Sequence, residues 1–85
     1  MSYQVEIAPA AVRQIKKLTP DIQQQVVQRL EELALEPRPD GVVKLSGSNS
    51  LYRVRLGAYR IIYQIQDNLL LVTVVKVGHR RDVYR

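Results

Sequence analysis

The spacing of hydrophobic and polar residues changes after the first seven positions, and the change separates a strand from a helix. Residues 3–7 (YQVEI) alternate between apolar and polar side chains, a period typical of a short strand. Apolar residues then recur at every third position, at Val12, Ile15 and Leu18. Pro9 suits the start of this segment, because the first N–H groups of a helix have no partner within it. We therefore expect a strand followed by a helix that begins at Pro9.

The helical pattern is clearest over residues 19–36 (TPDIQQQVVQRLEELALE). Thr19 is a candidate N-cap, Pro20 fits the first helical position, and Asp21 favours the positive end of the helix dipole. Pro37 ends the helix, and the next residues form an extended connector. We therefore predict an αα-hairpin whose second helix has one buried face, formed by Ile22, Val26, Leu30 and Leu33.

The second half of the chain predicts an antiparallel meander. A short strand, residues 42–45 (VVKL), precedes a polar loop. Three strands follow, and two tight turns separate them, Gly57-Ala58 and Asp67-Asn68. Gly78 is expected to end the last strand, before a short basic tail. The prediction for residues 1–85 is a single α+β domain with an N-terminal strand, an αα-hairpin and an antiparallel meander, whose main strands are Leu51–Leu56, Tyr59–Gln66 and Leu69–Val77.

The two predicted turns fix which residues face each other. Pairs read outward from the first turn are Leu56–Tyr59, Arg55–Arg60, Val54–Ile61, Arg53–Ile62 and Tyr52–Tyr63. Pairs read from the second turn are Ile65–Leu70, Tyr63–Val72 and Ile61–Val74. Because side chains alternate between faces, one face should be apolar and receive the helices, with Tyr52, Val54, Leu56, Tyr59, Ile61, Tyr63, Ile65, Leu70, Val72 and Val74. The other face should carry Arg53, Arg55, Arg60, Ile62, Gln64, Leu71, Thr73, Val75 and Val77.

The predicted pair of Arg55 and Arg60 places like charges directly opposite each other. Two unit charges about 5 Å apart repel by roughly 3 kcal/mol at an effective dielectric constant near 20, although solvent and salt reduce this for exposed groups. An anion between the two guanidinium groups would convert this repulsion into affinity, and the planar guanidinium suits phosphate oxygens. The alternative is a pair of surface arginines lying along the sheet. If the C-terminal tail folds back over the strand ends, Arg80 joins the three hairpin arginines. The predicted pairing of strands assumes that no β-bulge interrupts it.

Composition and charge narrow the function. The chain has 85 residues, 46% of them hydrophobic, with no Phe and no Trp, so Val, Ile, Leu and Tyr must form its core. Its net charge is +5, and from Leu51 onward seven Lys or Arg accompany two Asp, which favours a polyanion such as nucleic acid. The alternative is that the charge only maintains solubility. With no Cys and one His, we expect no disulfide framework, no thiolate metal site and no zinc site. Without a signal peptide or an apolar span, we expect a cytoplasmic protein with no membrane contact.

Two segments, "YRVRLGAYRIIYQI" and "VVKVGHRRDVYR", together with the helical hairpin, resemble the RelE toxins of the RelE/ParE toxin–antitoxin superfamily. The resemblance covers nearly the whole chain. It implies a ribosome-dependent endoribonuclease that cuts mRNA in the A site and inhibits translation. It also implies a cognate antitoxin, which neutralises the toxin and carries any contact with operator DNA. The implied reaction is attack of the RNA 2′-OH on the adjacent phosphorus, without metal or cofactor.

The same resemblance implies the functional residues. Arg60 and Arg80 would stabilise the charge that develops on the phosphorus in the transition state. The implied RNA-binding residues are Arg53, Arg55 and Arg81, and the implied catalytic residues are Arg60, Arg80, Tyr84 and His79.

The group that moves the proton stays open at this stage. Some RelE toxins have lysines where this chain has Arg53 and Arg55, and arginine is a poor base because it stays protonated. Three candidates lie near the C-terminus, Tyr84, His79 and Asp82. Tyr84 would act as an acid or base, or would stack on a nucleobase. His79 would protonate the leaving group. The alternative for His79 is a structural or merely exposed side chain.

Two other functions are compatible with the same fold. One is a ParE-like inhibitor of DNA gyrase without nuclease activity. The other is a non-enzymatic corepressor module that acts together with its antitoxin. The chain shows no helix-turn-helix pattern, so direct operator recognition is disfavoured. The basic face and Tyr84 favour the nuclease, because gyrase poisoning does not require these residues.

Overall fold

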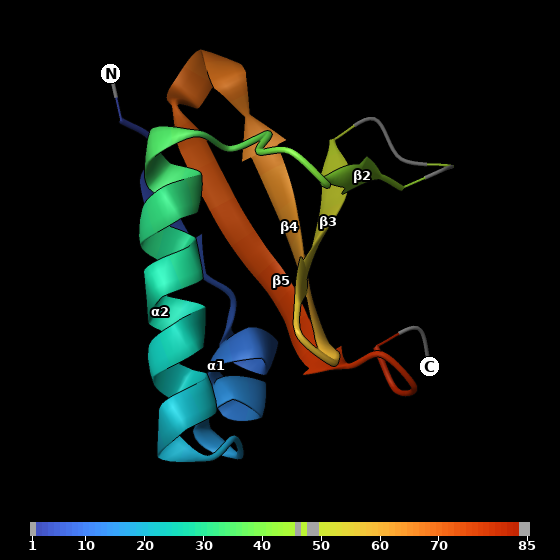
Figure 1. The fold of residues 1–85 in the computed structure, drawn as a ribbon. Coiled ribbons are helices and arrows are strands. Elements are labelled where there is room, and N and C mark those ends of the chain that lie inside the picture. The colour runs from blue at the N-terminus through green and yellow to red at the C-terminus, as the bar shows by residue number, and fades with distance from the viewer. Residues whose placement is uncertain (1, 46, 48–49, 84–85) are drawn as a thin grey trace.

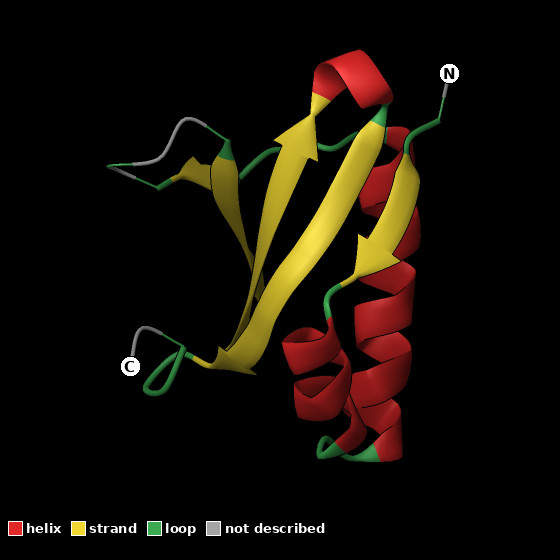
Figure 2. Ribbon diagram, turned by 180° about the vertical axis from the view of Figure 1, so that it is seen from behind, coloured by secondary structure: helices red, strands yellow, loops and turns green. Residues whose placement is uncertain are grey.

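The computed structural model describes residues 2–45, 47 and 50–83, and confirms the α+β class. The described residues form a five-stranded sheet with the order β1-β5-β4-β3-β2, in which β1 runs parallel to β5 and the other pairs are antiparallel (Figures 1 and 2). The elements are β1 (Gln4–Ile7), α1 (Pro9–Lys16), α2 (Pro20–Leu35), β2 (Val43–Lys44), β3 (Leu51–Leu56), β4 (Tyr59–Gln66), the short 3₁₀ helix η1 (Asp67–Leu69) and β5 (Leu71–His79).

Both helices lie on one face of the sheet, as the apolar pattern predicted (Figure 1). Their buried stripe meets the apolar face of β3, β4 and β5. The core is built from Val, Ile, Leu, Tyr and one Ala, and consists of Ala11, Val26, Leu30, Leu33, Tyr52, Val54, Leu56, Ile61, Tyr63, Ile65, Val72, Val74 and Val77. No helix in the described part of the chain is long and apolar enough to cross a membrane.

The predicted helix starts are confirmed. Helix α1 begins at Pro9, and α2 begins at Pro20 with Thr19 in the N-cap position. The Thr19 side chain makes no capping hydrogen bond to the helix backbone, and instead a hydrogen bond with it lowers the pKa of Asp21. Gln23 of α2 donates from Nε2 to the carbonyl of Ile15 at 3.0 Å. A side chain of the second helix therefore provides a hydrogen-bond donor for a carbonyl in the last turn of the first helix.

The β3–β4 hairpin has the predicted register at every pair, from Leu56 opposite Tyr59 outward. Its two-residue turn places Gly57 at a φ of 59°, a conformation that glycine adopts without the steric cost of a Cβ. Glycine in the first position is the requirement of a type II′ turn, whose twist matches that of the flanking strands. Arg55 and Arg60 are therefore directly opposite each other.

The predicted register between β4 and β5 is wrong. In place of a two-residue turn at Asp67-Asn68, the chain forms η1, followed by Leu70 in the left-handed conformation (φ 50°). The longer connection shifts the pairing by two residues, so Ile65 faces Val72 and Tyr63 faces Val74. Strand β5 consequently spans Leu71–His79 rather than Leu69–Val77, and it does not end at Gly78. The strand predicted over residues 42–45 is also shorter, Val43–Lys44.

A β-bulge beside Ile62 then moves Val77 to the opposite face. Ile62 pairs with Lys76 and Tyr63 with Val74, which leaves one extra residue on β5. Val77 was predicted on the arginine face, but it pairs with Ile61 and lies 2% exposed in the core. Its backbone N–H, beyond the end of β1, donates to Gln14 Oε1 of α1 at 2.8 Å. The helix thereby replaces the missing strand partner.

The buried hydroxyl of Tyr63 generates a stability prediction. It donates to the carbonyl of Pro37 at 2.7 Å, and burial raises its pKa to about 12. Tyr63→Phe leaves that carbonyl without its donor and should lower the free energy of unfolding by about 1–2 kcal/mol, or roughly 4–10 °C in Tm. Thermal and urea unfolding would measure this. In the half-buried control Tyr59→Phe, whose hydroxyl has no hydrogen-bond partner among the described residues, we expect less than about 0.5 kcal/mol. Equal losses in the two variants would contradict the assignment.

Candidate nucleic-acid interface

The three arginines of the β3–β4 hairpin surround one cavity of about 350 Å³. This arginine cavity is bounded by α2, by the connector after α2, and by strands β3 and β4. Four of its seven lining residues are arginines and one is an acid, so the lining carries a positive charge on balance. Its lining residues are Arg29, Asp40, Gly41, Arg53, Val54, Arg55 and Arg60.

The hairpin arginines differ in how firmly they are held. Arg55 is exposed and Arg53 is half-buried, whereas Arg60 is 9% exposed. Nη1 of Arg60 donates to the carbonyls of Gly57 at 3.1 Å and Tyr59 at 2.9 Å. The turn that sets the register therefore also fixes the Arg60 guanidinium, so its charge is oriented before any ligand arrives. Preorganised positive charge of this kind stabilises negative charge that develops during a reaction.

Arg29 is a cavity residue that the sequence did not reveal. It projects from α2, donates from Nη1 to the carbonyl of Arg55 at 2.7 Å, and forms an ion pair with Glu32 at 3.1 Å. The one available signal is its position on the helix, directly before the buried Leu30 and three residues after the buried Val26. That position places it beside the sheet, but only the tertiary packing shows that it reaches β3.

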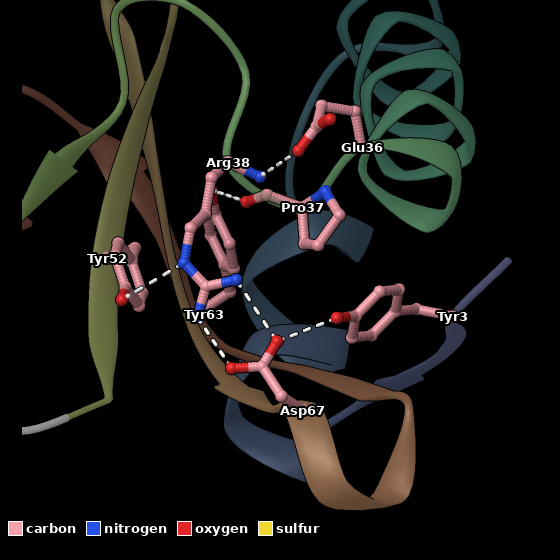
Figure 3. A network of polar contacts seen from close by, with 7 residues as sticks. All are labelled: Tyr3, Glu36, Pro37, Arg38, Tyr52, Tyr63 and Asp67. Carbon is pink, nitrogen blue, oxygen red and sulfur yellow. Dashed lines mark hydrogen bonds and ion pairs between the residues drawn. The ribbon is translucent and has the colours of Figure 1, made fainter. Parts of the chain in front are cut away.

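The connector that forms one wall of the cavity is held by a polar network at the other end of the sheet (Figure 3). Arg38 donates from Nη1 and Nη2 to the two carboxylate oxygens of Asp67 at 3.1 and 2.8 Å. Its Nε donates to the Tyr52 hydroxyl at 3.2 Å, and its guanidinium carbon lies 5.2 Å from the centre of that ring. Tyr3 donates to the same carboxylate at 2.6 Å. The network ties the connector to η1 and to the start of the chain.

The C-terminal segment follows β5 at the end of the sheet where the β3–β4 turn lies (Figure 1). Arg60 pairs with Gly78, and the backbone N–H of Arg80 donates to the carbonyl of Ala58 in the β3–β4 turn at 2.8 Å. Val83 is 1% exposed and packs against Gly78, which anchors the segment. The exposed side chains of Arg80 and Arg81 are outside the set that lines the arginine cavity. Tyr84 lies outside the described residues.

His79 lines a different cavity from the hairpin arginines. It pairs with Tyr59, its ring meets the Tyr59 ring edge-on at 5.7 Å, and its Nδ1 accepts from the backbone N–H of Arg81 at 3.2 Å. This second cavity, of about 400 Å³, also contains Gln14 and Lys17 of the helical hairpin region. The structure thus brings Arg53, Arg55 and Arg60 together and separates His79 from them. Among the described residues, no three His, Asp or Glu side chains are gathered as metal ligands.

The fold and the arginine cavity define a class of small, basic α+β proteins suited to binding a polyanion. The family model described as the ParE toxin of the type II toxin–antitoxin system parDE matches residues 5–84. The chain belongs to this toxin family, within the RelE/ParE superfamily.

The relatives carry RelE-type names. The chain is 34% identical over 86 residues to the toxin RelG of Mycobacterium tuberculosis, covering 100% of this chain and 99% of that protein. It is 31% identical over 88 residues to the mRNA interferase toxin RelE of Escherichia coli, covering 99% of this chain and 92% of that protein. The crystal structure of the archaeal RelE–RelB complex from Pyrococcus horikoshii superposes with a TM-score of 0.85 at 30% identity, over 98% of this chain and 100% of that chain. The chain is thus a RelE-type toxin of the type II class.

The Arg38–Asp67 pair makes the stability of the fold depend on pH. Hydrogen bonds from Arg38 and then Tyr3 lower the pKa of Asp67 from 3.8 to about 2. Because this pKa is lower in the folded chain than in the unfolded chain, the stabilisation is complete above about 3.8 and is lost as the pH falls through about 2. Asp67→Asn should therefore unfold at lower urea concentration than the wild type at pH 7, with a difference that shrinks steadily between pH 4 and roughly pH 2. A difference independent of pH, or one matched by the exposed control Glu6→Gln, would exclude this role.

Proposed function

We propose that this toxin is an mRNA endoribonuclease that acts in the A site of the translating ribosome. The observation that carries the proposal is the arginine cavity, which Arg53, Arg55 and Arg60 line together with Arg29. An RNA phosphate between two of them replaces a like-charge repulsion with charge-assisted hydrogen bonds. The mRNA interferase name of the E. coli relative supports the same conclusion.

The proposed reaction is a transesterification within the RNA. The 2′-oxygen attacks the adjacent phosphorus, the bond to the 5′-oxygen breaks, and the products are a 2′,3′-cyclic phosphate and a 5′-hydroxyl. Arg60, oriented by its own turn, stabilises the charge that develops on the phosphoryl oxygens. Arg53 and Arg55 hold the RNA backbone, while Arg80 and Arg81 extend the basic surface beyond the cavity. Tyr84 is proposed to move a proton or to stack on a nucleobase.

For His79 we propose a role other than that of a leaving-group acid. Because its ring lines the second cavity beside Tyr59, we propose that it positions the C-terminal segment, through its contacts with Tyr59 and the N–H of Arg81. Arg80, which follows directly, is thereby held next to the β3–β4 turn.

The proposed partners are a cognate antitoxin, the ribosome and its A-site mRNA, all in the cytoplasm. The solved relatives include RelE–RelB toxin–antitoxin complexes, which supports the antitoxin. An antitoxin segment with acidic residues would neutralise the arginine cavity. Contact with operator DNA would then be made by the antitoxin and not by this chain.

The second candidate is gyrase inhibition, which the ParE description of the matched family model favours. A gyrase inhibitor needs a protein-binding surface rather than a site for phosphate chemistry. A gyrase inhibitor therefore does not require several arginines to line one cavity. A corepressor acting only with its antitoxin has no such requirement either.

Primer extension on a reporter mRNA, with and without translating ribosomes, tests the nuclease. We expect cuts only in translated message, and a loss of about 10²–10³-fold in cutting rate for Arg60→Ala, because it removes an oriented charge from the transition state. Arg60 also braces the turn, so its thermal unfolding must be measured, and the exposed Arg55→Ala serves as a second variant with intact packing. Tyr84→Phe should slow cutting if the hydroxyl moves a proton. The control Arg13→Ala, on the exposed face of α1, should cut as the wild type does.

The other outcomes discriminate between the functions. Cuts in free RNA would support the nuclease activity and contradict its dependence on the ribosome. Growth arrest with broken DNA and uncut message would establish the gyrase alternative. Activity unchanged in both Arg60→Ala and Arg55→Ala would contradict the arginine cavity as the site.

A further inference from the structure

One acidic side chain lies among the arginines of the cavity. Of the described residues that line it, Arg29, Arg53, Arg55 and Arg60 are basic, and Asp40 is the single acid. It lies in the connector between α2 and β2. The charged residues that line the cavity with it are Arg29 on α2, Arg53 and Arg55 on β3, and Arg60 on β4.

The backbone holds Asp40 at the corner of a tight turn. The N–H of Val42 donates to the carbonyl of Pro39 at 3.1 Å, and Gly41 has a φ of 85°. Positive φ at the third residue is the signature of a type II turn, which places Asp40 at its second position. The turn is held on one side by the Arg38–Asp67 network and on the other by β2, where Val43 pairs with Arg53. Asp40 is thus presented to the cavity from a fixed backbone.

The carboxylate of Asp40 is not committed to a partner of its own. Glu32 and Asp67 form ion pairs, with Arg29 and Arg38 respectively. No described cation lies within ion-pair distance of Asp40, although it lines a cavity with four arginines. Its oxygens therefore remain able to accept a proton, which the guanidinium groups around it cannot do.

We propose that Asp40 is the general base of the cleavage reaction, an inference that rests on the proposed nuclease function. Its carboxylate takes the proton of the 2′-hydroxyl, and the O–H electron pair forms the new bond to phosphorus. The bond between phosphorus and the 5′-oxygen then breaks, and that oxygen takes a proton from water. The arginines bind the phosphate and Asp40 activates the nucleophile, so the two tasks belong to different residue types in one cavity.

Single-turnover cutting of mRNA on programmed ribosomes, measured against pH, tests the assignment. Asp40→Asn keeps the shape of the side chain but cannot accept the proton. We expect its maximal rate to fall by about 10²–10⁴-fold, with half-saturation changed by less than about threefold. The rate of the wild type should rise with pH on the acid side, and this rise should disappear in Asp40→Asn. Asp40→Glu should recover part of the rate, because it restores a carboxylate. The exposed control Asp21→Asn on α2 should match the wild type.

A pair of glycine variants separates position from chemistry. Gly41 and Gly47 both have positive φ, 85° and 79°, and neither would crowd a neighbour with an added Cβ. Gly41→Ala strains the turn that presents Asp40 and should slow cutting by about tenfold, whereas Gly47→Ala carries the same strain away from the cavity and should leave cutting unchanged.

The inference is overturned if Asp40→Asn cuts with the same rate and the same pH profile as the wild type. That result would not contradict the proposed nuclease function. Loss of cutting in Asp82→Asn instead would move the base to the C-terminal segment. Absence of cutting by the wild type on ribosomes would overturn both proposals at once.

Discussion

The two-residue turn at Gly57 is the constraint on which the rest of this structure depends. A strand that slips by one residue sends every side chain to the opposite face. Gly57, at positive φ, closes β3 and β4 with the single register that buries Val54 and Ile61 and leaves Arg55 facing Arg60. The same turn supplies carbonyls that hold the Arg60 guanidinium. Core packing and charge clustering thus follow from one local conformation.

A second constraint acts from the opposite end of the sheet. The connector after α2 has few backbone partners of its own, and it is fixed by side chains. Tyr63 donates to the carbonyl of Pro37, and Arg38 binds the carboxylate of Asp67 in η1. These contacts join segments that are far apart in the chain, and the wall of the arginine cavity that contains Asp40 follows immediately after them. The geometry of the cavity therefore depends on contacts outside it.

Most of the fold could be predicted because its signals are local. The apolar stripe of α2, the prolines at both helix starts and the glycine-first turn are each contained in a few neighbouring residues. The β4–β5 connection could not be predicted in this way, because Leu70 adopts a left-handed conformation that its residue type does not indicate. The bulge that buries Val77 likewise has no local signal, and the Val77 N–H donates to Gln14, which is distant in sequence.

The candidate site also has a part that local sequence signals predict and a part that only tertiary packing creates. Arg53, Arg55 and Arg60 were grouped from the register alone, since all three lie on one hairpin. Arg29 and Asp40 come from a helix and a connector, and only tertiary packing brings them to the same cavity. The alternation of side chains along β5 also could not predict that His79 lines a second cavity, because the bulge, which precedes His79, changes which face each later side chain occupies.

The central claim is that an RNA phosphate sits in the arginine cavity, and side-chain NMR measures this most directly. The isolated toxin would be titrated with a short single-stranded RNA that carries a 2′-O-methyl group on every ribose and so cannot be cut. The Nε–H resonances of Arg53, Arg55 and Arg60 should shift together, while that of Arg13 on the exposed face of α1 stays in place. Shifts at Arg13 with none at the hairpin arginines would contradict the account.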